Sequence, residues 1–442
     1  MASNMTTHES FDAPGTAVSN DAAYQYLPVE YTKQDAELLR ALANEYMEYA
    51  SLPVQQKTVR LWQDVNDLRP ARPVLIHSEI PWHEMDVDGE LTLTTSTPFA
   101  QRIEQDFRRR LYMWKHMAGD MVLEPVCYAP MIISNSGVGI AIDEQTRATD
   151  VNNNIVGHAF TSQIQCEDDL EKIVPPVVTL DEPKTRETLA AYQDILGDII
   201  RVELRGCPGF WFAPMDDIVQ YMGVEDLLVN LAAEPELVHA TMRRVMDGYL
   251  AGLDQYEKLG CLATNNTNYR IGSGGYGYTT ELPAGTAHGM ACSGMWGAAA
   301  SQIFTSVSPA MHDEFSIQYE KEWLDRFPIS YYGCCERLDN KMDILRNIRS
   351  LRKISISPWS DPAHAAEVIG RDYVISLKPS PATLAFDTFD EAVVRREVGA
   401  QLEAIRGCNA EVVIKDISTV RYEPQRLWKW VEIVHELCRS YE

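Results

Sequence analysis

The last third of the chain alternates short apolar stretches with amphipathic ones, and this alternation constrains the fold more than any other feature. The apolar stretches are rich in β-branched side chains, as buried strands are. Strands are expected at 329–332, 353–357, 373–377 and 411–414, and helices at 341–351, 361–369, 391–405 and 425–441. A strand followed by a helix about every 30 to 40 residues builds a parallel sheet. Because the strands lack polar alternation, both faces should be covered, and we expect a (β/α)8 barrel of the TIM type.

The earlier part of the chain carries the same signals less regularly. Helices are expected at 34–49, 59–68, 97–117, 182–199, 216–221, 225–258 and 301–327, and strands at 73–77, 131–133 and 200–204. Residues 137–180 are polar and are expected to form an irregular excursion from the core. We therefore divide the chain into a loose tail with a helical extension over 1–72 and a barrel over 73–442.

Charge and composition exclude several classes of partner. The 442 residues carry a formal net charge of -25 and no cluster of Lys and Arg of the kind that nucleic acids or anionic membranes attract. Residues 1–20 lack the apolar core of a signal peptide, and no apolar run is long enough to cross a membrane. Nine cysteines without the dense spacing of secreted scaffolds indicate a reducing compartment. We expect a soluble cytoplasmic protein.

Two thiols and a carboxylate follow the strand expected at 329–332, in the sequence Tyr332-Gly333-Cys334-Cys335-Glu336. Parallel α/β proteins place their chemistry at the carboxyl ends of strands. Cys334 and Cys335 are therefore candidate zinc ligands, and Tyr332 and Glu336 are candidate proton donors. Two alternatives stay open: Cys335 as a buried apolar side chain, and Glu336 as a cap for the helix that follows.

Other strand ends carry aromatic and ionisable side chains that could bind a substrate. His77 and Glu79 end the strand expected at 73–77, and Trp82 follows, a combination that suits an aromatic or cationic methylated compound. A lid packed by Trp82 is the alternative. The expected substrate-binding residues are His77, Glu79, Trp82, Trp296, Trp359 and Lys378.

A glycine-rich segment precedes one further candidate. Residues 272–277 match the GxGxxG pattern of dinucleotide-binding loops, but no clean helix start follows, so we discount nucleotide binding. A flexible loop that admits a large partner is expected instead, with simple loop packing as the alternative. His288 is a candidate catalytic residue or nitrogen ligand for zinc. Met290, Met295 and Trp296 could line an apolar pocket or pack the core.

Several stretches from residue 201 onward resemble the uroporphyrinogen decarboxylase superfamily, which includes cobalamin-linked methyltransferases on the same barrel. They are residues 206–212, 221–228, 234–239, 257–260 and 307–315, followed by the strand that ends at Cys334. The stretch Met-Arg-Gln-Ala-Gly-Arg, whose arginines hold porphyrin carboxylates in the decarboxylase branch, is absent from this sequence. The resemblance therefore implies the methyltransferase branch.

In that branch the same strand ends in His-x-Cys, a zinc ligand pair completed by a later Cys. Here the triplet is Tyr332-Gly333-Cys334, and residues 376–385 contain no Cys. The chain is instead similar to a group of longer relatives with Gly-Cys-Cys-Glu, found among corrinoid methyl-transfer systems. The resemblance implies that a methyl group moves from a small methylated substrate to the Co(I) corrinoid of a partner protein, with zinc as a candidate cofactor.

We predict an aromatic methyl ether as the substrate, so that the chain is an O-demethylase component. Two alternatives remain: a decarboxylase or other lyase on the same barrel, and a non-catalytic tetrapyrrole-binding protein. A two-fold homodimer is expected from base rates alone.

Overall fold

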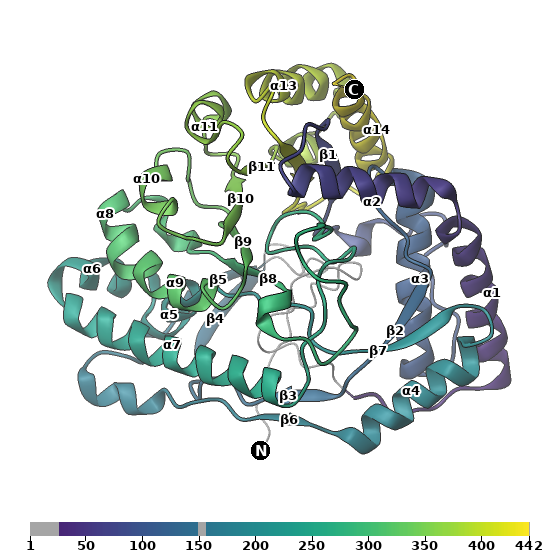
Figure 1. Ribbon diagram of the computed structural model, residues 1–442, viewed down its shortest axis with the longest axis horizontal. Coiled ribbons are helices and arrows are strands. Elements are labelled where there is room, and N and C mark those ends of the chain that lie inside the picture. Colours follow the sequence, from purple (N-terminus) through teal and green to yellow (C-terminus); the bar gives the residue numbers. More distant parts are fainter. Residues whose placement is uncertain (1–25, 149–155, 442) are drawn as a thin grey trace.

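The computed structural model describes residues 26–148 and 156–441. At its centre lies a parallel sheet of six strands in the order β1-β12-β11-β10-β9-β8, with helices on the outside (Figure 1). The strands are β1 (Val74–His77), β8 (Trp296–Ala299), β9 (Ile329–Tyr332), β10 (Leu351–Ile356), β11 (Val374–Leu377) and β12 (Ala410–Ile414). They are almost entirely buried, so the mixed α/β fold with a covered parallel sheet is confirmed.

The helices that connect these strands occur where the helical spacing of apolar residues predicts them. They include α7 (Pro235–Lys258), α9 (Gln318–Leu324), α11 (Pro362–Ile369), α13 (Glu391–Ala404) and α14 (Gln425–Arg439). Asp361 and Asp390 cap α11 and α13 by accepting backbone N–H groups of the first turn. Helix α14 buries Trp430 and Val434 and packs beside β1 and α13. Burial of these apolar faces holds the helices against the sheet.

Helices α1 (Lys33–Ala50) and α2 (Pro53–Asn66) precede the first strand, and α3 (Pro98–Met117) follows it. Helix α1 begins with a capping box, in which the Thr32 side chain accepts the backbone N–H of Asp35 and the Asp35 carboxylate accepts that of Thr32. The loop after β1 contains the short helix η1 (Trp82–Glu84). The tail expected at 1–20 lies outside the described residues.

A second set of parallel segments lies beyond the six-stranded sheet. Strand β2 (Val126–Pro130) pairs in parallel with β7 (Arg201–Arg205), and Cys207 forms a parallel bridge with Leu262. Helices α4 (Glu182–Leu196), α5 (Pro214–Met222) and α6 (Val224–Ala233) accompany this part. Among the described residues, no helix combines the length and apolar character needed to cross a membrane.

Some expected elements differ from the structure. The excursion at 137–180 is not purely irregular. It contains the antiparallel pair of β4 (Glu144–Ala148) with β5 (Val156–Phe160), and its last strand, β6 (Val178–Leu180), pairs antiparallel with β3 (Ile133–Asn135) just before it. The helix expected at 301–327 is interrupted, because Ser308 precedes a proline and adopts an extended conformation. It divides into η4 (Gln302–Thr305), α8 (Pro309–His312), the π-helical turn η5 (Asp313–Ile317) and α9.

Other boundaries shifted by several residues. The helix expected at 341–351 is only α10 (Met342–Leu345), because the chain from Leu351 onward pairs with β9 as part of β10. The strand expected at 131–133 does not form as such, because β2 ends at Pro130 and β3 begins at Ile133. The remaining short elements are η2 (Glu167–Lys172), η3 (Cys292–Gly294) and α12 (Ala382–Ala385).

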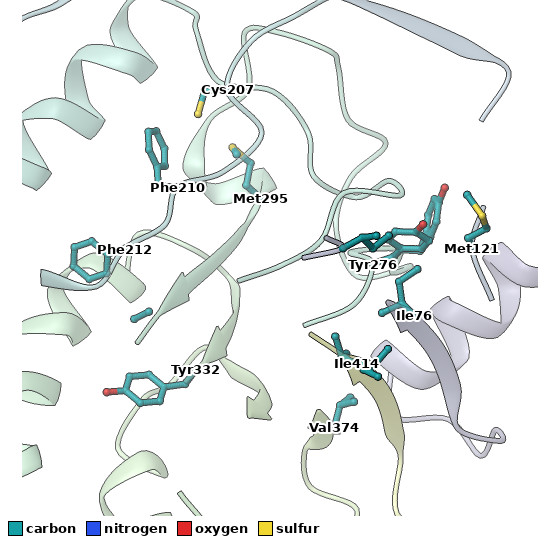
Figure 2. Packing of buried hydrophobic residues seen from close by; sticks show 14 of the residues in the cluster. Ile76, Met121, Cys207, Phe210, Phe212, Tyr276, Met295, Tyr332, Val374 and Ile414 are labelled. Carbon is teal, nitrogen blue, oxygen red and sulfur yellow. The ribbon is translucent and has the colours of Figure 1, made fainter. Parts of the chain in front are cut away.

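The glycine-rich segment is part of the core, which corrects the expectation of a flexible loop. A Cβ added at Gly274 would come within 2.5 Å of both Tyr331 and Glu411, so only glycine fits there. The Gly275 backbone N–H donates to Glu411 Oε1 at 2.9 Å, and Glu411 also pairs with fully buried Lys353 at 2.8 Å. Figure 2 shows neighbouring Tyr276 close to Ile76. The segment is fixed by a buried ion pair and by close packing.

Candidate functional site

Parallel strands bring their carboxyl ends to one edge of the sheet, and five ionisable residues that follow three strands meet there. Glu79 follows β1, Cys334 and Cys335 follow β9, and Lys415 and Asp416 follow β12. These five residues are called the edge cluster below. Parallel α/β enzymes keep their catalytic groups at this edge.

Cys335 is at the centre of the cluster and has a reactive environment. Its Sγ atom lies 3.6 Å from that of Cys334, 3.7 Å from Lys415 Nζ and 3.8 Å from Asp416 Oδ2. The hydrogen bond from the Cys334 thiol, together with the Lys415 charge, lowers the pKa of Cys335. The same hydrogen bond and burial raise the pKa of Cys334 well above its ordinary value. The half-buried Cys335 is therefore the more acidic thiol of the pair, an environment that favours reactivity over inert apolar packing.

Lys415 places a buried positive charge beside Cys335. Its side chain is 5% exposed, and Nζ lies 2.5 Å from Asp416 Oδ2 and 3.8 Å from Glu79 Oε2. Burial alone would favour the neutral amine, but the surrounding acidic groups outweigh burial and raise the pKa of Lys415 well above its ordinary value. Lys415 thus stays charged at neutral pH.

Glu79 is the carboxyl group of the cluster that can carry a proton near neutral pH. Its Oε2 atom accepts the backbone N–H of Asp416 at 3.0 Å, and its side chain is about one-third exposed. Removal from water raises the pKa of Glu79 to about 7, against the opposing charge of Lys415. Glu79 and Asp416 both have left-handed backbones, with φ of 52° and 54°. Non-glycine residues in this region are uncommon and gather at functional sites.

Lys378 and Tyr331 lie beside the cluster. Lys378 Nζ donates to the Tyr331 hydroxyl at 2.7 Å and to Ser376 Oγ at 3.0 Å. The Tyr331 hydroxyl also meets Ser273 Oγ of the glycine-rich segment at 3.0 Å. Lys378, a predicted substrate-binding residue, is therefore buried beside the edge rather than exposed on it.

Tyr332 lies on the other face of β9, which corrects its expected place at the site. Its hydroxyl donates to Glu320 Oε2 at 2.7 Å and lies 2.8 Å from His312 Nε2, both on the helical layer. Figure 2 shows the ring pointing away from Tyr276. Successive side chains of a strand alternate between faces, so Tyr331 and not Tyr332 faces Lys378.

Glu336 is a buried structural residue and not the helix cap that the sequence suggested. Its Oε2 atom accepts the backbone N–H of Cys334 at 2.7 Å, and Oε1 accepts that of Ser301 at 3.0 Å. The next helix, α10, begins at Met342, and no side chain caps it by a hydrogen bond. Glu336 therefore fixes the end of β9 to the chain after β8.

The predicted residues at the end of β1 and in the loop after it lie in different environments. His77 is buried, its Nε2 atom lies 2.7 Å from the carbonyl oxygen of Met117, and burial lowers its pKa to about 4. Trp82 packs against α3, with the Arg109 guanidinium 4.8 Å from the ring centroid and Tyr112 in edge contact. His77 and Trp82 hold the loop after β1, while Glu79 alone belongs to the edge cluster.

Three other predicted residues lie in environments of their own. His288 is exposed. The N–H of the adjacent Gly289 donates to the carbonyl oxygen of Gly260, just before the chain that bridges to Cys207. Trp296 is buried at the beginning of β8, where its indole N–H donates to Gly277. Trp359, after β10, is 72% exposed. The sequence predicted that these residues share one site, but the fold places Trp296 at the beginning of its strand and not at the strand end.

The residues present do not fit a zinc ion. Two sulfurs bound to one tetrahedral zinc at about 2.3 Å each lie roughly 3.8 Å apart, which is close to the separation in this pair. However, Lys415 already contacts Cys335 and Asp416, and the Cys334 thiol holds its proton. Among residues 26–148 and 156–441, no three His, Cys, Asp or Glu side chains gather in a way that could hold a metal ion.

Sequence comparison does not place the chain in a family, since no family model and no curated protein matches it. Structural comparison does find relatives. The fold is similar to that of a methyltransferase from Methanosarcina mazei. The TM-score is 0.50 at 12% identity, and the match covers 87% of this chain and 99% of that chain. At this identity the likeness concerns the fold, and it spans nearly the whole of both chains.

Proposed function

We propose that this protein is a methyltransferase that moves a methyl group from a small methylated substrate to the Co(I) corrinoid of a partner protein. The fold likeness to a methyltransferase supports the reaction class, and the edge cluster occupies the position where such folds keep their chemistry. The sequence resemblance described above supports an aromatic methyl ether as the substrate.

We also propose that the six-stranded sheet closes into a barrel. Pairing of β2 with β7 and the bridge between Cys207 and Leu262 provide further parallel segments. The Asp120 backbone N–H donates to the Leu75 carbonyl oxygen at 2.9 Å, which joins the chain before β2 to β1. These contacts support a ring of strands around the glycine-rich segment.

The difficult step in removing a methyl group from an ether is the departure of the oxygen. The carbon–oxygen bond breaks with both electrons remaining on oxygen, so the leaving group is a phenolate unless it receives a proton. Positioned proton donors are commonly worth about 100-fold to 10,000-fold in rate. The corrinoid, as the second substrate, supplies the nucleophile that accepts the methyl group.

The observation that carries the proposal is the pairing of Glu79 with Lys415 at the C-terminal edge, 3.8 Å apart. With a pKa of about 7, Glu79 is partly protonated at neutral pH and can donate its proton to the leaving oxygen. Lys415 remains charged and stabilises negative charge that develops beside it. Cys335 and Asp416 hold Lys415 in place.

The test is a methyl-transfer assay with a Co(I) corrinoid protein and a panel of aromatic methyl ethers, methylamines and thioethers. We expect the absorbance of the corrinoid to change with an aromatic methyl ether, and the matching phenol to accumulate. The Arg406→Gln variant, which removes an exposed surface pair with Glu403, is the control and should retain full activity. Absence of transfer from every compound would contradict the proposal, and release of carbon dioxide from a carboxylated substrate would favour a decarboxylase.

A further inference from the structure

Two buried cations beside the edge cluster have no carboxylate partner. Arg270 is 5% exposed and Lys378 is 2% exposed, and within the described residues neither forms a salt bridge. Two other buried cations are paired with carboxylates, Lys353 with Glu411 and Lys415 with Asp416. A buried charge without a partner is costly, and a chain with a net charge of -25 has many carboxylates with which to prevent it.

The groups that do contact these cations are neutral. Lys378 Nζ bonds to the Tyr331 hydroxyl and to the hydroxyl and carbonyl oxygens of Ser376. Arg270 donates from Nε to the Gly274 carbonyl oxygen at 2.9 Å. Its two terminal nitrogens have no hydrogen-bond partner in the described chain, yet they are not among the fully enclosed unpartnered atoms. The forked end of Arg270 therefore keeps donors that are unused within the described chain and not fully enclosed.

Both cations act on the edge cluster. The charge of Arg270 acts on Glu79 and on His77, which ends β1, and the charge of Lys378 acts on Asp416. Asp416 and Glu79 are themselves hydrogen-bonded. Tyr331 links the two cations, because its hydroxyl bonds both to Lys378 and to Ser273, which follows Arg270 in the chain. An anion bound by Arg270 and Lys378 would therefore lie within electrostatic reach of Glu79.

We propose that Arg270 and Lys378 bind an oxyanion of the substrate, namely a carboxylate carried by the methylated aromatic compound. The proposal rests on the function proposed above, because it takes the edge cluster as the reacting centre. Arg270 offers paired N–H donors that match a carboxylate, and Lys378 adds a point charge. The carboxylate of the substrate would be the negative partner that Arg270 and Lys378 lack within the described chain. Its methyl ether would extend toward Glu79.

Binding, measured by titration calorimetry without any corrinoid, tests this site independently of methyl transfer. The probes are a methoxybenzoate, benzoate, uncharged anisole and inorganic phosphate. We expect the two aromatic carboxylates to bind, anisole to bind at least about ten-fold more weakly, and Arg270→Gln or Lys378→Met to weaken carboxylate binding about ten-fold or more. Arg270→Lys should retain part of the affinity, and Arg406→Gln should retain all of it.

Thermal unfolding separates loss of the site from loss of the fold. Without a ligand, Arg270→Gln and Lys378→Met should unfold at the same temperature as the parent protein or at a higher one, because each removes an uncompensated buried charge. Benzoate should raise the unfolding temperature of the parent protein but not that of the variants.

Equal carboxylate affinity in parent and variants would overturn the proposal, and phosphate binding as tightly as benzoate would overturn the carboxylate assignment. Carboxylate binding that depends on Arg270 and Lys378, without methyl transfer to a corrinoid, would retain this site and reject the proposed reaction.

Discussion

The ammonium of Lys415 lies 3.7 Å from the Sγ atom of Cys335, and it is held there by Asp416 at 2.5 Å. A buried cation therefore stands where the sequence resemblance would place a metal. Its charge adds to the hydrogen bond from Cys334 in lowering the pKa of Cys335, whereas burial raises the pKa of Glu79 to about 7.

Replacing Lys415 should make Cys335 less reactive. Lys415→Met removes a positive charge that lowers the pKa of Cys335, so the fraction of thiolate at neutral pH should fall and alkylation by iodoacetamide should slow about ten-fold. Peptide mass spectrometry over a time course would measure the rate at this residue. The exposed Cys166 is the internal control, and an unchanged rate at Cys335 would disprove the assigned role of Lys415.

The methyl-transfer rate should depend on the protonation of Glu79. Because the acid form donates the proton and its pKa is raised to about 7, kcat should decline as pH rises through that value. Glu79→Gln should lower kcat about 100-fold or more at slightly acid pH and remove this decline. Glu432→Gln, on the surface of α14, should keep the parent profile. A Glu79→Gln variant with the parent pH profile would assign the proton to another group.

Zinc should not copurify with the protein in stoichiometric amount. Lys415 contacts both Cys335 and Asp416, and the Cys334 thiol retains its proton. Elemental analysis of protein purified without chelators should find far less than one zinc per chain. Lys415→Ala should bind more zinc than the parent, since the competing cation is gone. One tightly held zinc in the parent protein would show that the cluster rearranges around a metal.

Removing the Tyr332 hydroxyl should reduce stability and leave catalysis intact. Glu320 and His312 would each lose a buried partner, which costs about 1–3 kcal/mol of unfolding free energy. Tyr331→Phe is the matched comparison, because its hydroxyl contacts Lys378 and its loss should raise KM for the substrate. Urea unfolding followed by tryptophan fluorescence, with steady-state kinetics on both variants, measures these effects. A large loss of kcat in Tyr332→Phe would return Tyr332 to the reacting centre.

Local signals in the sequence were enough to predict the strands of the six-stranded sheet other than β8, and the edge at which the candidate site residues gather. The stretches at 329–332, 373–377 and 411–414 are strands, and Cys335 and Glu79 follow strands as expected. The same rule would have found Lys415 and Asp416, which directly follow the stretch at 411–414. Arg270 carried no such signal, because it lies just before the glycine-rich segment, whose burial depends on contacts with distant Tyr331 and Glu411.

The sequence by itself determined that strands and helices alternate, because apolar runs and helical spacing depend on residues close together in the chain. It also determined which residues stand at the strand ends. Only the tertiary structure decided that Tyr331 rather than Tyr332 faces Lys378, that Lys415 contacts Cys335, and that His288 lies elsewhere. Those outcomes depend on which face each strand buries and on contacts between distant segments, which local pattern does not encode.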